Sequence, residues 1–493
     1  MKLLCQSKNF SSCFVPYVLT VLTLVLTPKP DAAWGQDVPG TTQNTADATP
    51  GVLTLADVLA QAEANHPKLR GSDAERRAAT AKRVSKQGAF DVVPYAGSDY
   101  LRYNSTSTRG KPLNTTMSDV GVELPFRNGI KVVAGTRLNL GSPKSPDSST
   151  GNTGEWNVSI KAPLRRGFGI NEKSAAEQQA FIGEPIAAQN FAFTRLDVLR
   201  QASFAYWDWV AAGQKGTVAR DLLTLGETRA AQIRRLSKAG FLPEIDSVEA
   251  AGEVLRRRGA LIKAERDQQK AGFKLSLYLW GGGDGSDNAL PAPGLAPPAF
   301  PPIAQLAPDA VQSGRERAIV QNPQIQIARL QQDSLRIDER LAENDRQPTL
   351  DLVLNPGLDT GARSIGETMK AGLLFSVPLG RREATGRRDE ARLKREKFRQ
   401  EERLLIGQIQ TEVDDAANAV ELARLRYTVA EEEVTLAERL ESAERRKFEL
   451  GDGTLFLVNQ RERATAEARA RLIDVQTEYQ QSFAAFRAAT LQL

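Results

Sequence analysis

Few residues in this chain of 493 could carry out chemistry. It has one histidine, His66, directly before a proline, and two cysteines, Cys5 and Cys13. A catalytic triad needs a histidine beside its nucleophile, and a zinc site needs several converging His or Cys ligands. One histidine provides neither, and we find no glycine-rich phosphate-binding loop. We therefore predict no enzyme activity, no cofactor and no metal site.

Charged residues are abundant but nearly balanced, with 65 Lys and Arg against 60 Asp and Glu. The small positive excess is spread over the chain and does not make a nucleic-acid-binding patch, so no nucleic-acid partner is predicted. Paired carboxylates are frequent, as expected by chance on charged helices. The acidic run at residues 431–433 is interpreted as a solvated helix face.

The N-terminus has the pattern of a secretion signal. Lys2 and Lys8 precede an apolar run over residues 14–26, and the sequence Ala33-Trp34-Gly35 then offers small residues at the positions that signal peptidase recognises. The apolar run is too short to span a bilayer as a helix. We predict that cleavage removes both cysteines. No later segment is apolar enough for a membrane-spanning helix, so a membrane crossing would require a closed β-barrel.

The longest predicted element is a helix over residues 383–450, which contain no proline. Its apolar positions alternate in spacings of three and four, the pattern of a heptad seam. A second apolar stripe lies on a neighbouring face, which predicts packing on two sides, as in a ring of helices. At 1.5 Å per residue the helix would be roughly 100 Å long. The first stripe includes Ile409, Val413, Ala416, Val420 and Ala423, and the second includes Leu422, Leu425, Val429, Leu436 and Leu440.

Alternation of apolar and polar residues predicts strands in two regions of the chain. In the first region Asn128-Gly129 is a strong hairpin signal between two alternating runs. The predicted strands lie within residues 92–103, 120–124, 130–140 and 156–162 in the first region, and 350–354 and 369–377 in the second.

The same order of elements occurs twice, which indicates an internal duplication with an enlarged first β region. Each half has a helix interrupted at an Asn-Pro or Asn-His-Pro sequence, a β region, and a long helical hairpin. The predicted parts are a signal peptide (1–35), a first repeat (36–280, β region about 90–164, tip near 240), a Pro/Gly-rich linker (281–305) and a second repeat (306–493, β region about 349–379, tip near 451).

This arrangement resembles the TolC family of outer-membrane channel proteins, also called outer-membrane efflux proteins. The resemblance rests on the paired Asn-Pro helix starts, the strand-to-helix junctions and the two tips, and it covers nearly the whole chain after residue 35. The junctions are residues 160–169 and 375–379, and the tips are residues 239–248 and 450–460.

The resemblance implies a mainly α fold with a β-barrel part. It implies a homotrimer in which long coiled-coil hairpins form a periplasmic α-barrel and each protomer gives four strands to a twelve-stranded barrel. Located in the outer membrane, in contact with its lipid, such a channel would serve a tripartite efflux or type I secretion system. Its partners would be a periplasmic adaptor and an inner-membrane pump of the RND or ABC type.

The tips are the candidate sites. The resemblance implies adaptor docking at Gly240, Asp246, Val248, Gly451 and Val458. The family's acidic constriction positions fall here on Leu457 and Gln460, and the basic residue of its closed tip falls on Gly453, so cation selectivity is not expected to carry over. The candidate constriction residues are Asp452, Leu457 and Gln460.

Two alternatives remain open at this point. One is a periplasmic coiled-coil adaptor or scaffold without a membrane barrel, although adaptors normally carry one helical hairpin rather than two. The other is a secretion channel dedicated to one polypeptide, which would share the whole architecture. Neither the exported substrate nor the pump follows from the sequence.

Overall fold

The computed structural model describes residues 51–104, 110–145, 149–281, 288–297, 299–362 and 364–493. The predicted signal peptide lies outside these residues. The chain divides into two compact units, Met1–Gly51 and Val52–Leu493, and the second is described below. None of the helices in the described ranges combines the length and the hydropathy of a membrane-spanning helix.

The first half begins with two helices that meet at His66. Helix α2 (Leu55–Asn65) starts at a capping box in which Thr54 and Asp57 bond to each other's backbone N–H groups. Helix α3 (Pro67–Gln87) follows and ends in a short 3-10 turn, η1 (Gly88–Phe90). After the strands come the long helix α4 (Glu172–Lys238), which runs through Pro185, and α5 (Glu244–Ser276).

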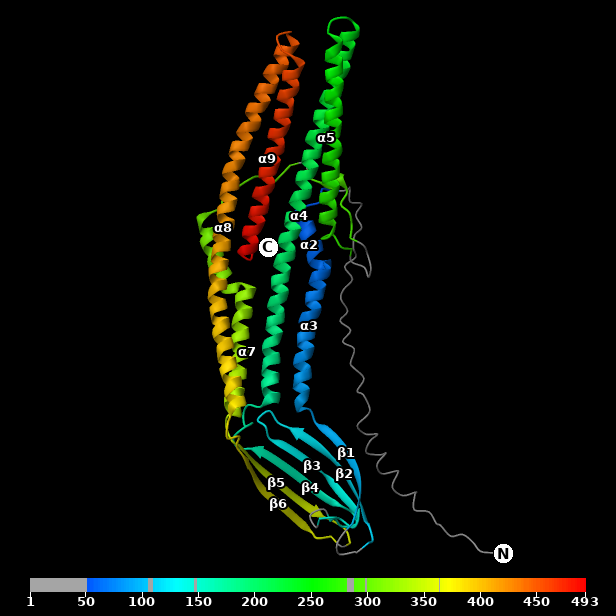
Figure 1. Cartoon of the computed structure of the whole chain (residues 1–493), viewed down its shortest axis with the longest axis vertical. Helices are drawn as coiled ribbons and strands as arrows, with labels where there is room; N and C mark the ends of the chain where they lie inside the picture. Colours follow the sequence, from blue (N-terminus) through cyan, green and yellow to red (C-terminus); the bar gives the residue numbers. More distant parts are fainter. Residues whose placement is uncertain (1–50, 105–109, 146–148, 282–287, 298, 363) are drawn as a thin grey trace, which may run out of the picture. The chain divides into compact units, whose positions relative to one another are not determined.

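The second half has the same order of helices. A 3-10 turn, η4 (Pro293–Leu295), precedes α6 (Pro308–Gln321) and α7 (Pro323–Asp345). After two strands, α8 (Arg382–Glu449) and α9 (Leu455–Ala489) form the second long hairpin. In Figure 1 the turns of both long hairpins lie at one end of the unit Val52–Leu493 and the strands lie at the other.

The six strands form one antiparallel sheet in the order of the sequence. The sheet joins the two halves because β4 pairs with β5. Its strands are β1 (Val93–Tyr103), β2 (Leu113–Pro125), β3 (Lys131–Gly141), β4 (Glu155–Pro163), β5 (Thr349–Asp359) and β6 (Glu367–Ser376).

The number of strands corrects one expectation. The resemblance implied four strands per protomer, whereas the described residues form six. The physical reason is the enlarged first β region, whose extra residues form a complete hairpin, β2–β3, that pairs within the sheet. The six strands are those that the alternation of apolar residues predicted.

The two faces of the sheet differ in polarity. Residues that pair across neighbouring antiparallel strands share a face, so the register assigns each side chain to one side. One face is mostly apolar, and it carries most of the exposed large apolar side chains of the strands. The members of this apolar face that are exposed are Tyr100, Val120, Leu140, Trp156, Val158, Leu358, Met369, Leu373 and Phe375.

The opposite face is polar and carries ion pairs between neighbouring strands. Lys131 Nζ lies 2.7 Å from Glu123 Oε2, Arg137 Nη2 lies 2.5 Å from Glu155 Oε2, and Lys161 Nζ lies 2.9 Å from Asp351 Oδ2. A sheet with one apolar and one polar face separates two environments. In the single chain the apolar face is largely exposed, whereas the polar face contains buried residues such as Glu155, Asp351 and Asp359.

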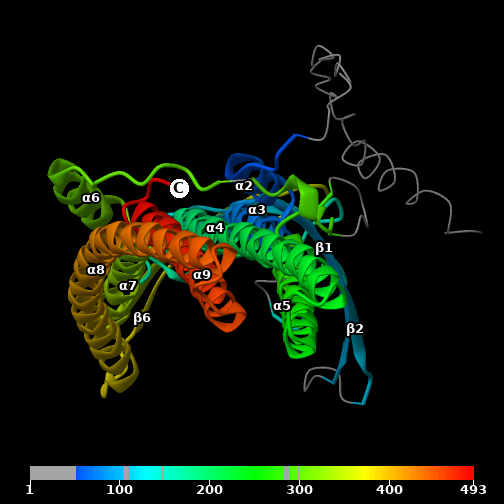
Figure 2. The ribbon, with the colours of Figure 1, turned by 90° about the horizontal axis from the view of Figure 1, so that it is seen from above.

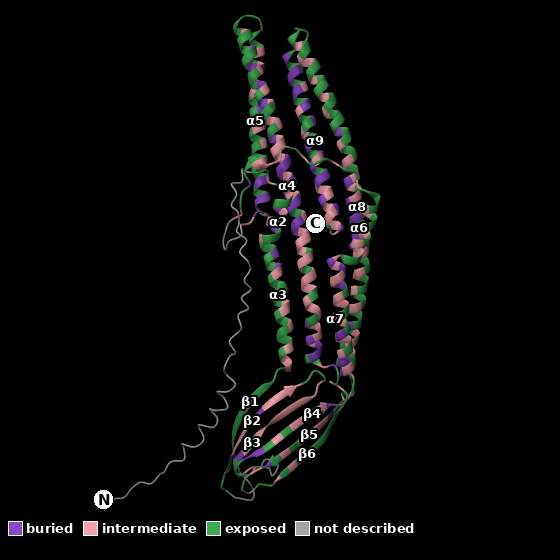
Figure 3. Ribbon diagram, turned by 180° about the vertical axis from the view of Figure 1, so that it is seen from behind, coloured by how far each residue is buried: buried purple, intermediate pink, exposed green. Residues whose placement is uncertain are grey.

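The long helices form one layer in which α4 contacts both α5 and α9, and α9 contacts α8. Figure 2 shows this layer as a curve of helices seen from above. The first apolar stripe of α8 is buried, as predicted, against α9 and the shorter helices. The second stripe is exposed, so it lacks a partner within the described part of this chain. Figure 3 shows buried residues along the helix contacts and exposed ones on α8 and at the tips.

Candidate functional site at the helical tips

Both long hairpins turn at a glycine with a positive φ angle. At the first tip, Gly240 has φ of 79°, its N–H donates to Ser237 O, and the next N–H, of Phe241, donates to Leu236 O. These two bonds define a Schellman motif, which ends a helix by satisfying its last carbonyl groups. Only glycine adopts this backbone conformation without a steric penalty.

The second tip repeats this geometry. Gly451 has φ of 83°, its N–H donates to Phe448 O, and the N–H of Asp452 donates to Lys447 O. Both glycines therefore end their helices. Neither position has another atom within 4 Å of where a Cβ would stand, so the backbone angle alone requires glycine there.

The first tip exposes apolar side chains around its turn. Phe241 is 78% exposed, Ile245 67% and Val248 62%. Asp246 lies in the first turn of α5, where a carboxylate is stabilised by the helix dipole. It is half-buried, and no ion pair or side-chain hydrogen bond joins it to another helix within the described part of this chain.

The predicted residues of the second tip separate into two groups. Asp452 and Gln460 are exposed, and Leu457 is 38% exposed. Val458, in contrast, is 0% exposed and packs inside the unit, so in this conformation it offers no surface to a partner.

A small apolar cluster joins the two tips. It contains buried residues of α4, α5 and α9, and α8 contributes the half-buried Phe448. Its buried members are Ala230, Ile233, Ala250 and Leu455. The tips of the two hairpins are thus held together rather than free.

Below this cluster lies a buried group of charged side chains, the tip ion-pair cluster: Arg229, Glu253, Arg257, Arg445 and Glu462. These residues come from all four long helices. Glu462 is 1% exposed, Glu253 2% and Arg257 3%, so three of the five charges are almost fully removed from solvent. Buried charges are tolerated only when they are paired and hydrogen-bonded.

Glu462 is the centre of the tip ion-pair cluster. Its Oε2 accepts from Arg229 Nη1 at 2.6 Å and from Arg257 Nη2 at 2.9 Å, and Arg229 Nη2 also contacts Oε1. Arg445 Nη2 lies 3.4 Å from Oε1. A single carboxylate therefore connects α9 to α4, α5 and α8.

Arg257 is the second connecting residue. Its Nε donates to Glu253 Oε1 at 3.0 Å, and its Nη1 donates to the carbonyl of Leu222 on α4 at 2.9 Å. A Cβ on Gly226 would lie 2.9 Å from Arg257 Cδ. The glycine in α4 therefore makes room for the arginine to cross from α5 to α9.

The pKa values of the two buried carboxyl groups are lowered. Burial by itself would raise the pKa of Glu462, but the hydrogen bonds and charges of Arg229 and Arg257 outweigh it and hold the pKa below its ordinary value. For Glu253 burial is again opposed and outweighed, here by Arg256 and Arg257. Both groups are therefore charged at neutral pH.

The sequence analysis missed this cluster, although a signal exists. Leu455, Val458, Glu462, Thr465 and Ala468 follow one another at spacings of three and four along α9, and all are buried. A glutamate at a seam position of a coiled-coil helix predicts a buried charge that needs a partner. The identity of the partners could not be inferred, since they lie on other helices.

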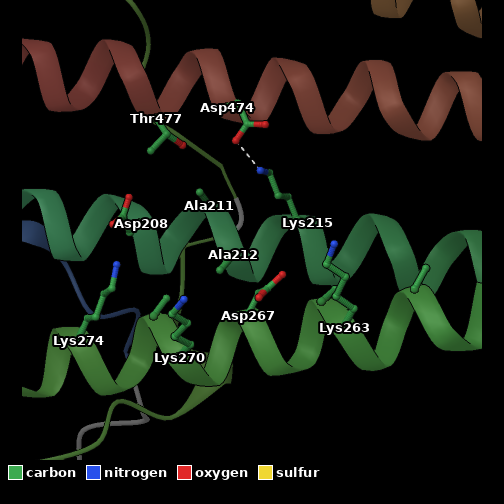
Figure 4. A pocket seen from close by; sticks show the side chains of 13 residues that line it. Asp208, Ala211, Ala212, Lys215, Lys263, Asp267, Lys270, Lys274, Asp474 and Thr477 are labelled. Atoms are coloured by element: carbon green, nitrogen blue, oxygen red, sulfur yellow. Dashed lines mark hydrogen bonds and ion pairs between the residues drawn. The ribbon is translucent and has the colours of Figure 1, made fainter.

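A shallow groove lies further along the layer, between α4, α5 and α9, with a volume of about 370 Å³. Figure 4 shows lysines from α4 and α5 around it, with Lys215 pointing to Asp474 of α9. Lys263, Lys270 and Lys274 line the same groove beside Asp208 and Asp267. The lysine and aspartate side chains that line this groove do not form a recognisable catalytic arrangement. Among the described residues, no group of three or more His, Cys, Asp or Glu side chains could hold a metal ion.

Comparison with known proteins identifies the class. Residues 315–490 match the family model described as outer membrane efflux protein. This match covers the second half of the chain, and the predicted resemblance to the TolC family of outer-membrane channels is confirmed there by the family model and, over most of the chain, by the fold. A search of curated protein sequences finds no match.

Solved structures extend the likeness to most of the chain. The outer-membrane channel OprN is 14% identical with a TM-score of 0.64, covering 88% of this chain and 89% of its own. The Campylobacter jejuni CmeC outer membrane channel is 12% identical with a TM-score of 0.64, covering 88% and 85%. The open state of the Neisseria gonorrhoeae MtrE outer membrane channel is 14% identical with a TM-score of 0.63, covering 92% and 95%. At these identities the likeness is one of fold.

Proposed function

We propose that three copies of this chain form the outer-membrane exit channel of an export system. The helical layers of the three copies would close into a periplasmic tunnel, and their sheets would close in the outer membrane. Substrate would arrive from an inner-membrane pump of the RND or ABC type through a periplasmic adaptor, in efflux or in type I secretion.

One observation carries this proposal: a two-faced sheet stands at the end of a layer of long helices. The apolar face of the sheet suits lipid, and the polar face suits a water-filled interior. Two apolar surfaces of the single chain are exposed: the apolar face of the sheet and the second stripe of α8. Exposed apolar surfaces of this size are expected to be removed from water by a partner or by lipid. Lipid would cover the first, and a neighbouring copy would cover the second.

The tips are the proposed place of docking and closure. The exposed positions around Gly240 and Gly451, with Asp246 and Val248, would meet the adaptor. Asp452, Leu457 and Gln460 would line the constriction, since all three have exposed surface in the single chain. Residues 36–280 and 306–493 would be two copies of one ancestral repeat.

The test is purification from detergent-solubilised outer membrane, followed by sizing and particle imaging. The proposal expects a trimer with a tube of roughly 100 Å below its membrane-embedded end, the length given by the helix rise. A soluble periplasmic monomer or dimer would overturn it and would favour the adaptor or scaffold alternative. Identification of the cargo by export assays would separate efflux from secretion of one polypeptide.

A further inference from the structure

The first β region of this chain contributes four strands to the sheet and the second contributes two. We propose that all six strands of each copy belong to the closed sheet at the membrane end of the channel. Three copies would then build a wall of eighteen strands, three times six. This inference rests on the trimeric channel proposed above.

The pairing of the extra hairpin, β2–β3, is continuous on both of its sides. Strand β2 pairs with β1 from Val93↔Glu123 to Tyr103↔Leu113. It also pairs with β3 over eleven positions, and β3 pairs with β4 over seven. A hairpin lying outside the wall would leave one of these ladders unpaired, at the cost of its hydrogen bonds.

The hairpin also continues the two faces of the sheet. Val122 and Val132 lie on the same apolar face as Ile160 of β4, as the register requires. On the polar face, β3 is tied to both neighbours through the ion pairs of Lys131 with Glu123 and of Arg137 with Glu155. A strand whose apolar and polar residues lie on the same faces as those of its neighbours has the pattern of a membrane-barrel strand, with lipid on one side and water on the other.

The turn of the hairpin is anchored at the helical end. Arg127 forms a bidentate ion pair with the buried Glu177 of α4, at 2.7 and 2.8 Å, and its guanidinium lies 5.0 Å from the centre of the Phe90 ring. Asn171, the N-cap of α4, donates from Nδ2 to the Arg127 carbonyl at 3.1 Å. A Cβ on Gly129 would lie 2.3 Å from the carbonyl oxygen of Gly167. The turn therefore packs tightly on the strand-to-helix junction instead of hanging free.

The edges of the sheet permit closure between copies. Strands β1 and β6 each have one neighbouring strand in the described part of the chain. Strand β1 leaves the helical end after α3, and β6 returns to it before α8. A β6 strand beside the β1 strand of the next copy would therefore be antiparallel, which continues the alternation. Closure removes both open edges.

A wall of eighteen strands is wider than the twelve-stranded wall that the resemblance implied. Since barrel diameter grows roughly linearly with strand number, the increase is about 1.5-fold, and walls of 16–18 strands leave an aqueous channel. The membrane end would then pass bulkier cargo than the closed tips admit. The selective step would lie at the tips.

Cysteine cross-linking tests the contact between copies directly. The native cysteines, Cys5 and Cys13, lie in the predicted signal peptide, so introduced cysteines would stand alone in the mature chain. Ser98→Cys on β1 with Ala371→Cys on β6 places two thiols on the apolar face of the two edge strands. Mild oxidation, or a short bifunctional thiol reagent, is expected to give covalent dimers and trimers on denaturing gels. In two further variants, Ala371→Cys is replaced by Met369→Cys or by Leu373→Cys. These variants test other alignments of β6 with β1 of the next copy.

Two matched controls make the result specific. Ser118→Cys with Ala371→Cys moves the first thiol to β2, inside the sheet, and should give no link between copies. Ser98→Cys with Ser118→Cys should link within one chain, because the two hydroxyl oxygens are 3.0 Å apart. Absence of every β1–β6 link while the internal link forms would overturn the eighteen-stranded wall.

Imaging of the purified trimer separates this inference from the proposed function. A three-fold particle with eighteen strands at the membrane end supports both. A trimeric channel whose wall has twelve strands overturns the inference and leaves the channel intact. A particle without a trimeric membrane end overturns the proposed function and the inference together.

Discussion

Glu462 makes more ion pairs with other helices than any other residue of the tip ion-pair cluster, and its carboxylate balances the buried Arg257 and the half-buried Arg229. Replacing Glu462 with Gln keeps the shape but leaves Arg229 and Arg257 without the charge that they contact. Removing one partner of a buried pair typically costs about 3–5 kcal/mol. We expect the tip ends of α5 and α9 to open more readily, measured by hydrogen exchange of their backbone amides.

A surface pair gives the control for this substitution. Glu438 on α8 pairs with Arg469 on α9 at 2.6 Å, and both side chains are 46% exposed. Because exposed pairs contribute only about 0–1 kcal/mol, Glu438→Gln should leave hydrogen exchange nearly unchanged. Equal exchange in the two variants would mean that the tip ion-pair cluster has no special role in holding the helices.

Gly226 offers a second prediction at this scale, because it makes room for Arg257. The variant Gly226→Ala forces a Cβ against the Arg257 side chain, and such overpacking typically costs about 1–3 kcal/mol. Gly259→Ala on α5 is the matched control, since nothing lies within 4 Å of its Cβ position. There alanine should stabilise the helix by up to about 1 kcal/mol. Thermal unfolding of the two variants should therefore shift in opposite directions.

The tip ion-pair cluster also predicts a pH dependence. The pKa of Glu462 is held below its ordinary value of 4.5 in the folded chain, so the unfolded chain binds the proton more readily. The contribution of this carboxylate to stability is then complete above about pH 4.5 and is lost as the pH falls through the lower folded pKa. The protection of tip amides, which is the intrinsic exchange rate at a given pH divided by the observed rate, should therefore fall in that acid range.

Glu462→Gln removes this titrating group and serves as the control for the pH experiment. The variant should start from faster exchange and show a smaller change on acidification. Glu253 titrates in the same direction, so a residual pH dependence is expected from it. An identical acid response in the variant and the native chain would contradict the assignment to Glu462.

At the scale of elements, the two tip turns depend on glycine for their backbone conformation. A β-branched residue such as valine at Gly240 or Gly451 would adopt a positive φ at a cost of about 1–2 kcal/mol. That strain lies at the tips, far from the sheet and from the buried seam of α8. We expect Gly240→Val and Gly451→Val to reduce export more than trimer assembly, measured by cargo release and by native gel.

Alanine at the same two positions separates backbone strain from side-chain bulk. It shares most of the positive-φ penalty but adds only one methyl group, and no atom lies near it in the single chain. Similar losses with alanine and valine would assign the effect to the turn geometry. Complete export by a trimer carrying both valine substitutions would contradict the importance of the tips.

The helical layer leaves an apolar surface of α8 uncovered in the single chain. One stripe of α8 is buried within the chain, while the second, from Leu422 to Leu440, remains exposed. An exposed apolar stripe along a long helix is the expected surface for another copy. The proposed trimer covers it by the same packing that buries the first stripe.

For the whole molecule, the proposed lining of the constriction predicts ion selectivity. The positions that are acidic in well-studied members of the family are Leu457 and Gln460 here, and neither carries charge. Although Asp452 and Glu244 remain acidic candidates at the tips, the missing acidic residues at these two positions lead us to expect weak cation selectivity in reconstituted bilayers. The measurement is the reversal potential under a salt gradient. A potential that strongly favours cations would show that another acidic ring governs the pore.

Local periodicity determined much of what the sequence predicted correctly. The heptad seam of α8 and the positions of the two tips depend on residues close together in the chain. The alternation of apolar residues likewise placed six strands, whereas the resemblance implied four. The physical reason is that helix and strand periods, caps and turns are set by interactions over a few residues.

Only the tertiary structure decided which distant residues meet. The tip ion-pair cluster joins Arg229, Arg257, Arg445 and Glu462, one from each long helix, and no local pattern specifies that combination. The same holds for the pairing of β4 with β5 and for the contact of Arg127 with Glu177. Such contacts depend on how whole elements pack, so the sequence could indicate a buried charge on α9 but not its partners.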